Sequence, residues 1–179
     1  MFVKLENESE IIARCCEGEI DSFREIYNHF REPLYRVAFR MIGSKEDAED
    51  ALQMMFIKLY QNIKQFRGQS KLSTYLYQIL LHTCYDLRRS KKIVTNQPLK
   101  ETDLFYKPQN ELQLQLEEAL QQLPDKMKEC FVLFAIEGFK QFEIAEIMGI
   151  STGTVKAHIF QAKEKLRDLL SERESEVAH

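Results

Sequence analysis

The stretch QFEIAEIMGISTGTVKAHIFQ, residues 141–161, carries the strongest structural signal in this sequence. Its apolar and small residues have the spacing of two helices joined by a tight turn: Ile144, Ala145, Met148, Gly149, Ile150 and Val155. Gly149 suits the turn because a residue without a Cβ adopts a positive φ at little cost. Ser151 stands where an N-cap residue would begin the second helix. The stretch therefore predicts a helix–turn–helix.

Polar residues at the start of the second helix suit contact with DNA. Hydroxyl groups and cations at a helix N-terminus bind phosphates and base edges in the major groove. The candidates are Ser151, Thr152, Thr154, Lys156, His158 and Lys163. The alternative is an ordinary corner of a helical bundle with a solvated lysine face.

Helical periodicity extends along most of the chain on both sides of this motif. Upstream, the next apolar stripe consists of Leu112, Leu116, Ala119, Leu120 and Leu123. Pro124 is predicted to end that helix and to lie in the first turn of the following one. Residues 94–110 have no period and contain two prolines, so they are predicted to be a flexible linker. The fold class is therefore all-α, with small helical domains at residues 1–93 and 111–179.

The N-terminal domain shows three further helical segments. The first is striped by Leu34, Val37, Ala38 and Met41 and is predicted to end at Gly43. Ser44 is predicted to cap the second, with Asp47 in the capping-box position. A polar loop, residues 67–71, leads to the third, residues 72–89.

Two charged clusters flank these helices, and each has two interpretations. Glu46, Asp47, Glu49 and Asp50 form an acidic group. It is either a patch for a basic protein partner or charge that compensates the helix dipole; metal binding is disfavoured because no histidine lies at ligand spacing. The basic cluster is Arg88, Arg89, Lys91 and Lys92, which follows Tyr75, Tyr77 and Tyr85. Cations interleaved with aromatic rings suit single-stranded DNA, but tyrosines in a core beside a solvated helix end explain the same pattern.

Composition sets the remaining limits. The chain has 179 residues, 44% hydrophobic and 30% charged, with only 6 Gly and 4 Pro, which argues against disorder and against an all-β fold. The net charge is −3, so any DNA binding must come from local patches. The four cysteines form no CxxC pair, and no cofactor or metal site is predicted. Without a signal peptide or a long apolar run, a cytoplasmic location is expected.

Three segments, in order, resemble the RNA polymerase sigma-70 family, in its extracytoplasmic-function (ECF) group. LYRVAFRMIGSKEDAEDALQMMFIKLY, residues 34–60, resembles the polymerase-binding segment of the family. FRGQSKLSTYLYQILLHTCYDLRRSKK, residues 66–92, resembles the segment that melts and reads the minus-ten promoter element. LPDKMKECFVLFAIEGFKQFEIAEIMGISTGTVKAHIFQAKEKLR, residues 123–167, resembles the domain that reads the minus-thirty-five element.

The resemblance implies a role for each segment. Residues that match the family's polymerase contacts are Asp47, Glu49, Asp50 and Gln53. Residues that match its minus-ten contacts are Arg67, Lys71, Tyr75, His82, Arg88, Arg89, Lys91 and Lys92. The implied partners are core RNA polymerase, promoter DNA and an anti-sigma factor.

Some positions depart from the family pattern. Tyr75 stands in place of a tryptophan, Leu81 in place of an arginine and His82 in place of an asparagine. An imidazole does not reproduce the paired donor and acceptor of a carboxamide, so the minus-ten preference is expected to differ. Within the reading helix, Ala157, His158 and Gln161 replace a hydroxyl residue and two arginines. Fewer cations predict weaker phosphate anchoring or a different minus-thirty-five sequence.

The expected function is that of a sigma initiation factor with no catalytic chemistry of its own. The alternative is a helix–turn–helix regulator that binds a symmetric operator as a dimer. An enzyme is not supported, because the sequence has no glycine-rich phosphate loop, nucleophile–base motif or metal set.

Overall fold

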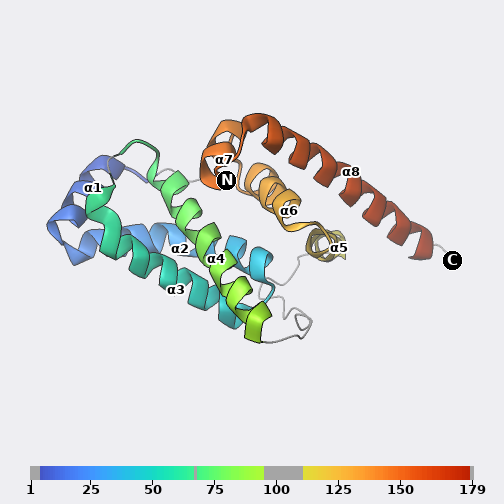
Figure 1. The fold of residues 1–179 in the computed structure, drawn as a ribbon, viewed down its shortest axis with the longest axis horizontal. Coiled ribbons are helices and arrows are strands. Elements are labelled where there is room, and N and C mark those ends of the chain that lie inside the picture. The colour runs from blue at the N-terminus through green and yellow to red at the C-terminus, as the bar shows by residue number, and fades with distance from the viewer. Residues whose placement is uncertain (1–4, 67, 95–110, 178–179) are drawn as a thin grey trace. The chain divides into compact units, whose positions relative to one another are not determined.

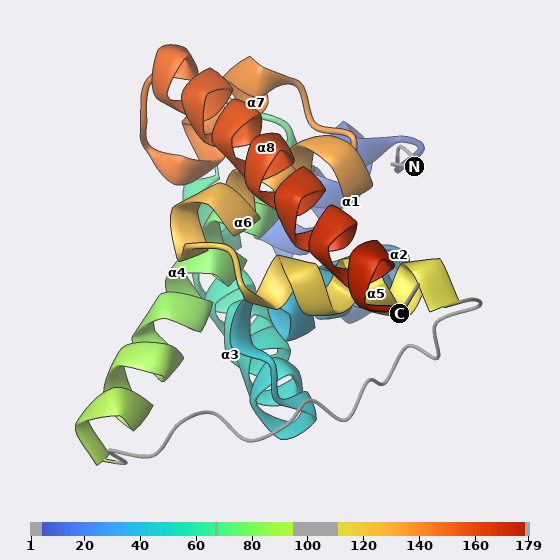
Figure 2. The same ribbon diagram turned by 90° about the vertical axis from the view of Figure 1, so that its right-hand side faces the viewer.

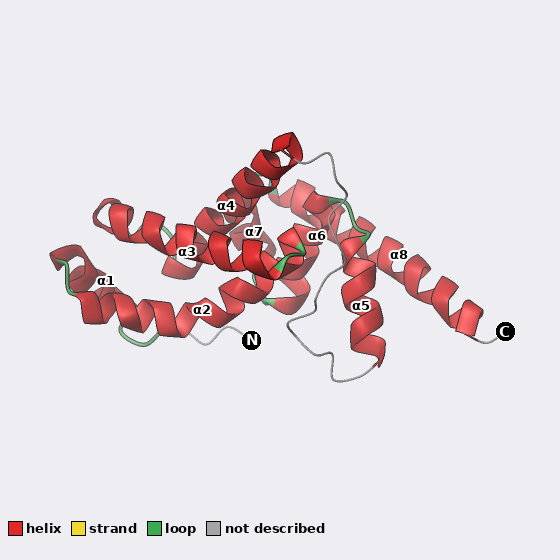
Figure 3. Ribbon diagram, turned by 90° about the horizontal axis from the view of Figure 1, so that it is seen from below, coloured by secondary structure: helices red, strands yellow, loops and turns green. Residues whose placement is uncertain are grey.

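The computed structural model of the chain describes residues 5–66, 68–94 and 111–177. Within these ranges the chain forms eight α-helices, two short helical turns and no strand (Figure 3). The all-α class predicted from the sequence is confirmed. The helices fall into two compact units, one on either side of residues 95–110. All but the first residue of the predicted linker, 94–110, lies outside the described residues.

The first unit contains four α-helices (Figure 1): α1 Glu8–Glu17, α2 Ile20–Ile42, α3 Lys45–Asn62 and α4 Leu72–Val94. The 3-10 turn η1, Ile63–Gln65, follows α3 directly. α2 packs against each of the other three helices, and α3 also packs against α4. The largest side chains of the core are almost wholly removed from solvent: Ile26, Phe30, Leu34, Met55, Leu59, Leu76, Tyr77 and Leu80. Burial of this apolar surface holds the four helices together.

The boundary between α2 and α3 lies where the sequence predicts it. Gly43 has a φ of 81°, and its N–H donates to the carbonyl of Phe39 at 2.7 Å. The Oγ of Ser44 accepts from the N–H of Asp47 at 3.4 Å and so caps α3. Both signals are local, because a left-handed glycine ends a helix and a serine begins one.

The sequence analysis did not predict where α2 begins, because the apolar pattern found in this helix starts only at Leu34. Pro33 lies inside this helix, where a proline removes one backbone hydrogen bond and usually ends the helix. The helix continues because Ile26, Phe30, Leu34 and Val37 form one buried stripe across the proline. Tertiary packing outweighs the local cost here.

The second unit contains α5 Glu111–Gln121, α6 Asp125–Phe131, α7 Gln141–Met148 and α8 Thr152–Val177, with the π-helical turn η2, Val132–Ile136, after α6. α8 packs against α5, α6 and α7 (Figure 2). Leu120, Leu133, Ile144 and Val155 are fully buried in this unit. Pro124 occupies the N-cap position of α6, one residue before the first turn in which the sequence placed it. In the part of the chain that the structure describes, no helix is long and apolar enough to cross a membrane.

Candidate nucleic-acid and polymerase interfaces

The helix–turn–helix predicted at residues 141–161 is formed by α7 and α8. Gly149 ends α7 with a φ of 64°, and the N–H of Ile150 donates to the carbonyl of Ala145 at 3.1 Å. The Oγ of Ser151 accepts from the N–H of Thr154 at 3.0 Å and lies 2.8 Å from the Oγ1 of Thr154. Ser151 therefore caps α8, as the sequence predicts, and fixes where the helix begins.

Most of the predicted minus-thirty-five residues lie on the surface of α8. Ser151, Thr152, Thr154, Lys156 and Lys163 are exposed, whereas Val155, Ile159, Ala162 and Leu166 form the buried face. The first turn of α8 thus presents hydroxyl groups and a helix N-terminus to solvent, an arrangement that suits phosphate oxygens.

Two of these residues are less free than the sequence indicated. His158 is only half exposed; its Nδ1 is buried and has no hydrogen-bond partner within the described residues. Any contact from His158 to DNA is therefore left to Nε2. The Nζ of Lys163 lies 5.4 Å from the ring centroid of Phe134, so this cation makes a cation–π contact within the second unit.

Residues that resemble the minus-ten contacts lie along α4. Tyr75, His82 and Arg89 recur every seven residues, which places them on one face of the helix. His82 and Arg89 are exposed and Tyr75 is half-buried. Lys71, at the start of α4, is exposed, and Arg88 is half-buried. Arg67 and the side chains of Lys91 and Lys92 lie outside the described residues.

The tyrosines near this face divide between surface and core. The ring of Tyr75 packs against that of Phe66, with centroids 5.0 Å apart, and burial raises the pKa of Tyr75. Tyr77 is completely buried and fills the core. The idea that Tyr77 stacks on DNA bases is therefore wrong, and the core interpretation holds for it. Tyr85 is half-buried.

The residues of the acidic group at the start of α3 also differ in their exposure to solvent. Glu49, Asp50 and Gln53 are exposed, as a polymerase contact requires. Asp47 is only 5% exposed and lies in the first turn of α3, where its N–H donates to the Oγ of Ser44. Asp47 is thus poorly placed to meet a partner directly.

An exposed apolar strip, which the sequence analysis did not identify, continues from this acidic group. Met54, Ile57 and Tyr60 are 37%, 56% and 56% exposed, and they follow Asp50 and Gln53 at helical spacing along α3. Aromatic side chains of α2 extend the strip: Phe23 packs on Tyr60 and Tyr27 on Phe56, each with centroids 4.9 Å apart. These residues, with Ile20, are called the α2–α3 strip below. Adjacent exposed apolar side chains of this kind mark interaction surfaces.

The sequence carried a partial signal for this strip, which did not show whether its residues are exposed. α3 carries apolar residues at Met54, Ile57 and Tyr60 as well as on the buried stripe of Ala51, Met55 and Leu59. A second apolar face on a helix is available for burial against a further segment or a partner. Within the described residues, no group of three or more His, Cys, Asp or Glu side chains is arranged to hold a metal ion.

Comparison with known proteins places both units in one family. The model of Sigma-70 region 2 matches residues 26–93, and that of Sigma-70, region 4 matches residues 113–166. The ECF RNA polymerase sigma factor SigW of Bacillus subtilis is 32% identical over 174 residues, covering 86% of this chain and 91% of SigW. The chain belongs to the ECF group of RNA polymerase sigma factors. This sigma factor is a transcription initiation factor that directs RNA polymerase, and the dimeric-regulator alternative is not favoured.

Further relatives and solved structures agree with this assignment. The ECF RNA polymerase sigma-E factor of Haemophilus influenzae is 28% identical and covers 90% of this chain and 94% of its own. CnrH, solved in complex with the cytosolic domain of CnrY, has a TM-score of 0.74 at 22% identity and covers 92% of this chain and 97% of its own. The sigma factor RpoE of Bartonella quintana, solved with the anti-sigma factor NepR, has a TM-score of 0.73 at 24% identity, covering 83% and 96%. At these identities the two structures support the fold.

Proposed function

We propose that this sigma factor uses three separate surfaces: the exposed face of α3 for core RNA polymerase, the Tyr75–His82–Arg89 face of α4 for the minus-ten element, and the start of α8 for the minus-thirty-five element. The observation that carries the proposal is that polar and apolar side chains share one exposed face of α3. On that face Asp50 and Gln53 are followed by Met54 and Ile57.

The composition of the α3 face suits a protein partner better than DNA. Asp50 would repel phosphates, whereas a carboxylate and an amide beside exposed apolar groups form the mixed surface typical of a protein interface. The apolar part supplies surface for burial, and the polar part fixes orientation. Asp50 and Gln53 are therefore proposed as direct contacts, and Asp47 as a residue that holds the start of the helix.

The α4 face suits DNA that is opening. Tyr75 offers a half-exposed aromatic ring. Arg89 offers a cation on the same face of the helix, two seven-residue steps further along. Bases stack on aromatic rings while cations hold the backbone, and an extruded base costs a few kcal/mol of unstacking. The packing of Tyr75 on Phe66 supports this role, because a wedge must be held rigidly.

The start of α8 suits duplex DNA. Thr152, Thr154 and Lys156 are all exposed there, so two hydroxyl-bearing residues and a cation lie on the surface at the N-terminal end of the helix. Because the whole chain is net acidic, with a charge of −3, we expect weak duplex binding by the free chain and firm promoter binding only by the holoenzyme.

We also propose that this protein has no enzymatic activity, acts in the cytoplasm where polymerase and promoter DNA meet, and is held inactive by an anti-sigma factor. The last point rests on the two similar structures, each of which was solved with a second protein bound. No described residue identifies such a partner.

Run-off transcription tests the proposed function. Purified bacterial core RNA polymerase is given genomic fragments with and without the chain, and start sites are mapped. Discrete start sites that depend on the added chain are expected. Nanomolar, salt-resistant binding of the free chain to a palindrome, with no effect on transcription, would support a repressor instead.

A further inference from the structure

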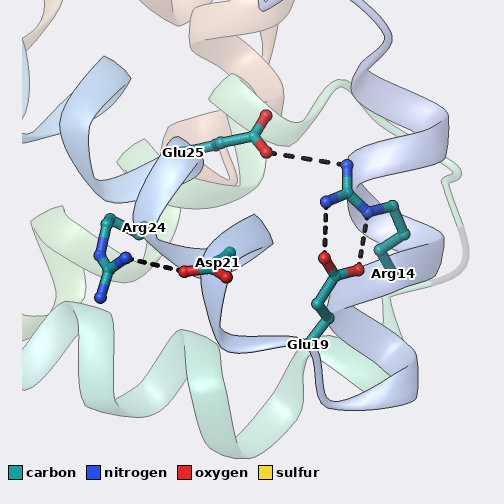
Figure 4. A network of polar contacts seen from close by, with 5 residues as sticks. All are labelled: Arg14, Glu19, Asp21, Arg24 and Glu25. Carbon is teal, nitrogen blue, oxygen red and sulfur yellow. Dashed lines mark hydrogen bonds and ion pairs between the residues drawn. The ribbon is translucent and has the colours of Figure 1, made fainter.

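At its C-terminal end, α1 makes hydrogen bonds and ion pairs to the start of α2. Arg14 donates to both carboxylate oxygens of Glu19, from Nε at 2.7 Å and from Nη2 at 2.6 Å, and its Nη1 lies 3.7 Å from Glu25 on α2 (Figure 4). Ile11 and Cys15 on the other side of α1 are buried. The helix is thus held between its ion pairs and the core.

The same helix reaches the segment that precedes the minus-ten face. The thiol of Cys16 lies 3.5 Å from the carbonyl of Ile63 in η1. At the opposite end of α1, the Oε1 of Glu8 accepts from the backbone N–H of Leu72 at 3.0 Å, a bond between residues 64 positions apart. α1 therefore contacts the chain at both ends of the stretch between Ile63 and Leu72.

The bond from Glu8 supplies an acceptor that the side chain of Lys71 cannot provide. The first backbone bond of α4 runs from the N–H of Tyr75 to the carbonyl of Lys71, so Lys71 occupies the N-cap position. A lysine side chain has no acceptor oxygen, whereas α3 and α8 begin at serines that cap them. Leu72 is fully buried, and a buried N–H needs a partner.

From this geometry we infer that Glu8 is a positioning residue for minus-ten recognition. By capping α4 it sets the first turn, and with it the exposed Lys71 and the ring of Tyr75 one turn later. This inference rests on the proposed function, because it takes α4 as the minus-ten surface. Glu8 itself contacts no DNA in this account.

The test uses holoenzyme and a forked DNA, with a duplex minus-thirty-five element and a single-stranded minus-ten segment, taken from a promoter mapped by run-off transcription. We expect Glu8→Ala to weaken binding of the fork about tenfold, the effect typical of losing a hydrogen bond to a charged group. Binding to a duplex that carries only the minus-thirty-five element should stay within about twofold, as should competition for core polymerase.

Three further variants separate positioning from general effects. Glu8→Gln keeps an acceptor oxygen at the same reach and should restore most of the fork binding. Glu8→Asp keeps the charge but is one methylene shorter, so it should behave like Glu8→Ala with less risk to the fold. Glu10→Ala removes another first-turn carboxylate of α1, one that is exposed, and should bind like the wild type. Hydrogen exchange of the full chain should show faster exchange at the start of α4 for Glu8→Ala and Glu8→Asp, and not for Glu8→Gln or Glu10→Ala.

The outcomes distinguish this inference from the function on which it rests. If Tyr75→Ala weakens fork binding and neither Glu8→Ala nor Glu8→Asp does, Glu8 has no positioning role. Equal losses from Glu8→Ala and Glu10→Ala would reduce the effect to charge and also overturn the inference. If neither Tyr75→Ala nor Glu8→Ala weakens binding, α4 is not the minus-ten surface, and both proposals fall.

Discussion

Ser151 allows the stability of the reading helix to be separated from its contact with DNA. Its Oγ caps α8 through the N–H of Thr154 at 3.0 Å, while its side chain is exposed at the proposed DNA surface. Ser151→Ala removes the cap and should cost about 1 kcal/mol in unfolding free energy. Ser151→Asp keeps an acceptor and adds a favourable charge at the helix N-terminus, so stability should stay within about 0.5 kcal/mol.

The two variants should behave differently toward promoter DNA. The carboxylate that Ser151→Asp introduces would face the DNA phosphates. Two like charges about 4 Å apart in water repel by about 1 kcal/mol. That energy corresponds to a roughly fivefold loss of affinity for the minus-thirty-five element. We expect the loss to shrink as salt rises, because an exposed charge pair is screened.

The assay combines thermal unfolding of the free chain with holoenzyme binding to a duplex minus-thirty-five fragment at several salt concentrations. Ser171→Ala is the matched control, since Ser171 is an exposed serine on the same helix, far from its N-terminus, and its Oγ donates to the carbonyl of Asp168 at 2.9 Å. A Ser151→Asp variant that is stable and yet binds this fragment as tightly as the wild type would refute the proposal that the start of α8 contacts DNA.

Three more predictions concern the first unit and the thiols of both units. Tyr75→Ala should impair open-complex formation more than closed-complex binding, and normal permanganate reactivity in the minus-ten region would exclude a wedge role. Tyr77→Ala should instead lower the unfolding free energy by about 3–5 kcal/mol, measured by denaturant titration, because it empties a fully buried site; a loss below about 1 kcal/mol would contradict its place in the core. Burial raises the pKa of Cys15 to about 11 and that of Cys130 to about 12, so both should resist alkylation at pH 8 while half-buried Cys16 reacts, as followed by peptide mass spectrometry; equal rates in the folded chain would contradict the burial.

The parts of the fold that could be predicted from sequence are those fixed by local signals. Gly43 and Ser44 separate α2 from α3, and Gly149 and Ser151 separate α7 from α8, at the expected positions. Each acts within four residues of itself, through a positive φ or a side-chain cap. The helix–turn–helix was therefore readable without any knowledge of packing.

The parts that escaped prediction depend on how the helices are rotated against one another. The sequence grouped Tyr75, Tyr77 and Tyr85 beside the basic cluster and left open whether they lie in the core, and packing buries only Tyr77 completely. Asp47 looked like an exposed carboxylate and is buried at a helix start. The bond from Glu8 to Leu72 joins residues 64 apart, and no local pattern announces such a contact.

The α2–α3 strip escaped for a related reason. An exposed aromatic residue and a core aromatic residue are the same letters in a sequence, and Phe56 and Tyr60 could have belonged to either class. The structure resolves the ambiguity by pairing them with Tyr27 and Phe23 on α2 rather than inserting them into the core.

The central claim is that the exposed face of α3 binds core RNA polymerase, and competition for limiting core enzyme tests it most directly. Asp50→Ala combined with Gln53→Ala changes two exposed residues, so the fold and melting temperature should be kept, with circular dichroism as the check. At an interface, loss of a central polar contact costs about 2 kcal/mol or more, roughly thirtyfold in affinity. The account predicts that the folded double variant loses the competition to the wild-type chain by about that factor. Equal competition by a well-folded variant would remove Asp50 and Gln53 from the interface and contradict the account.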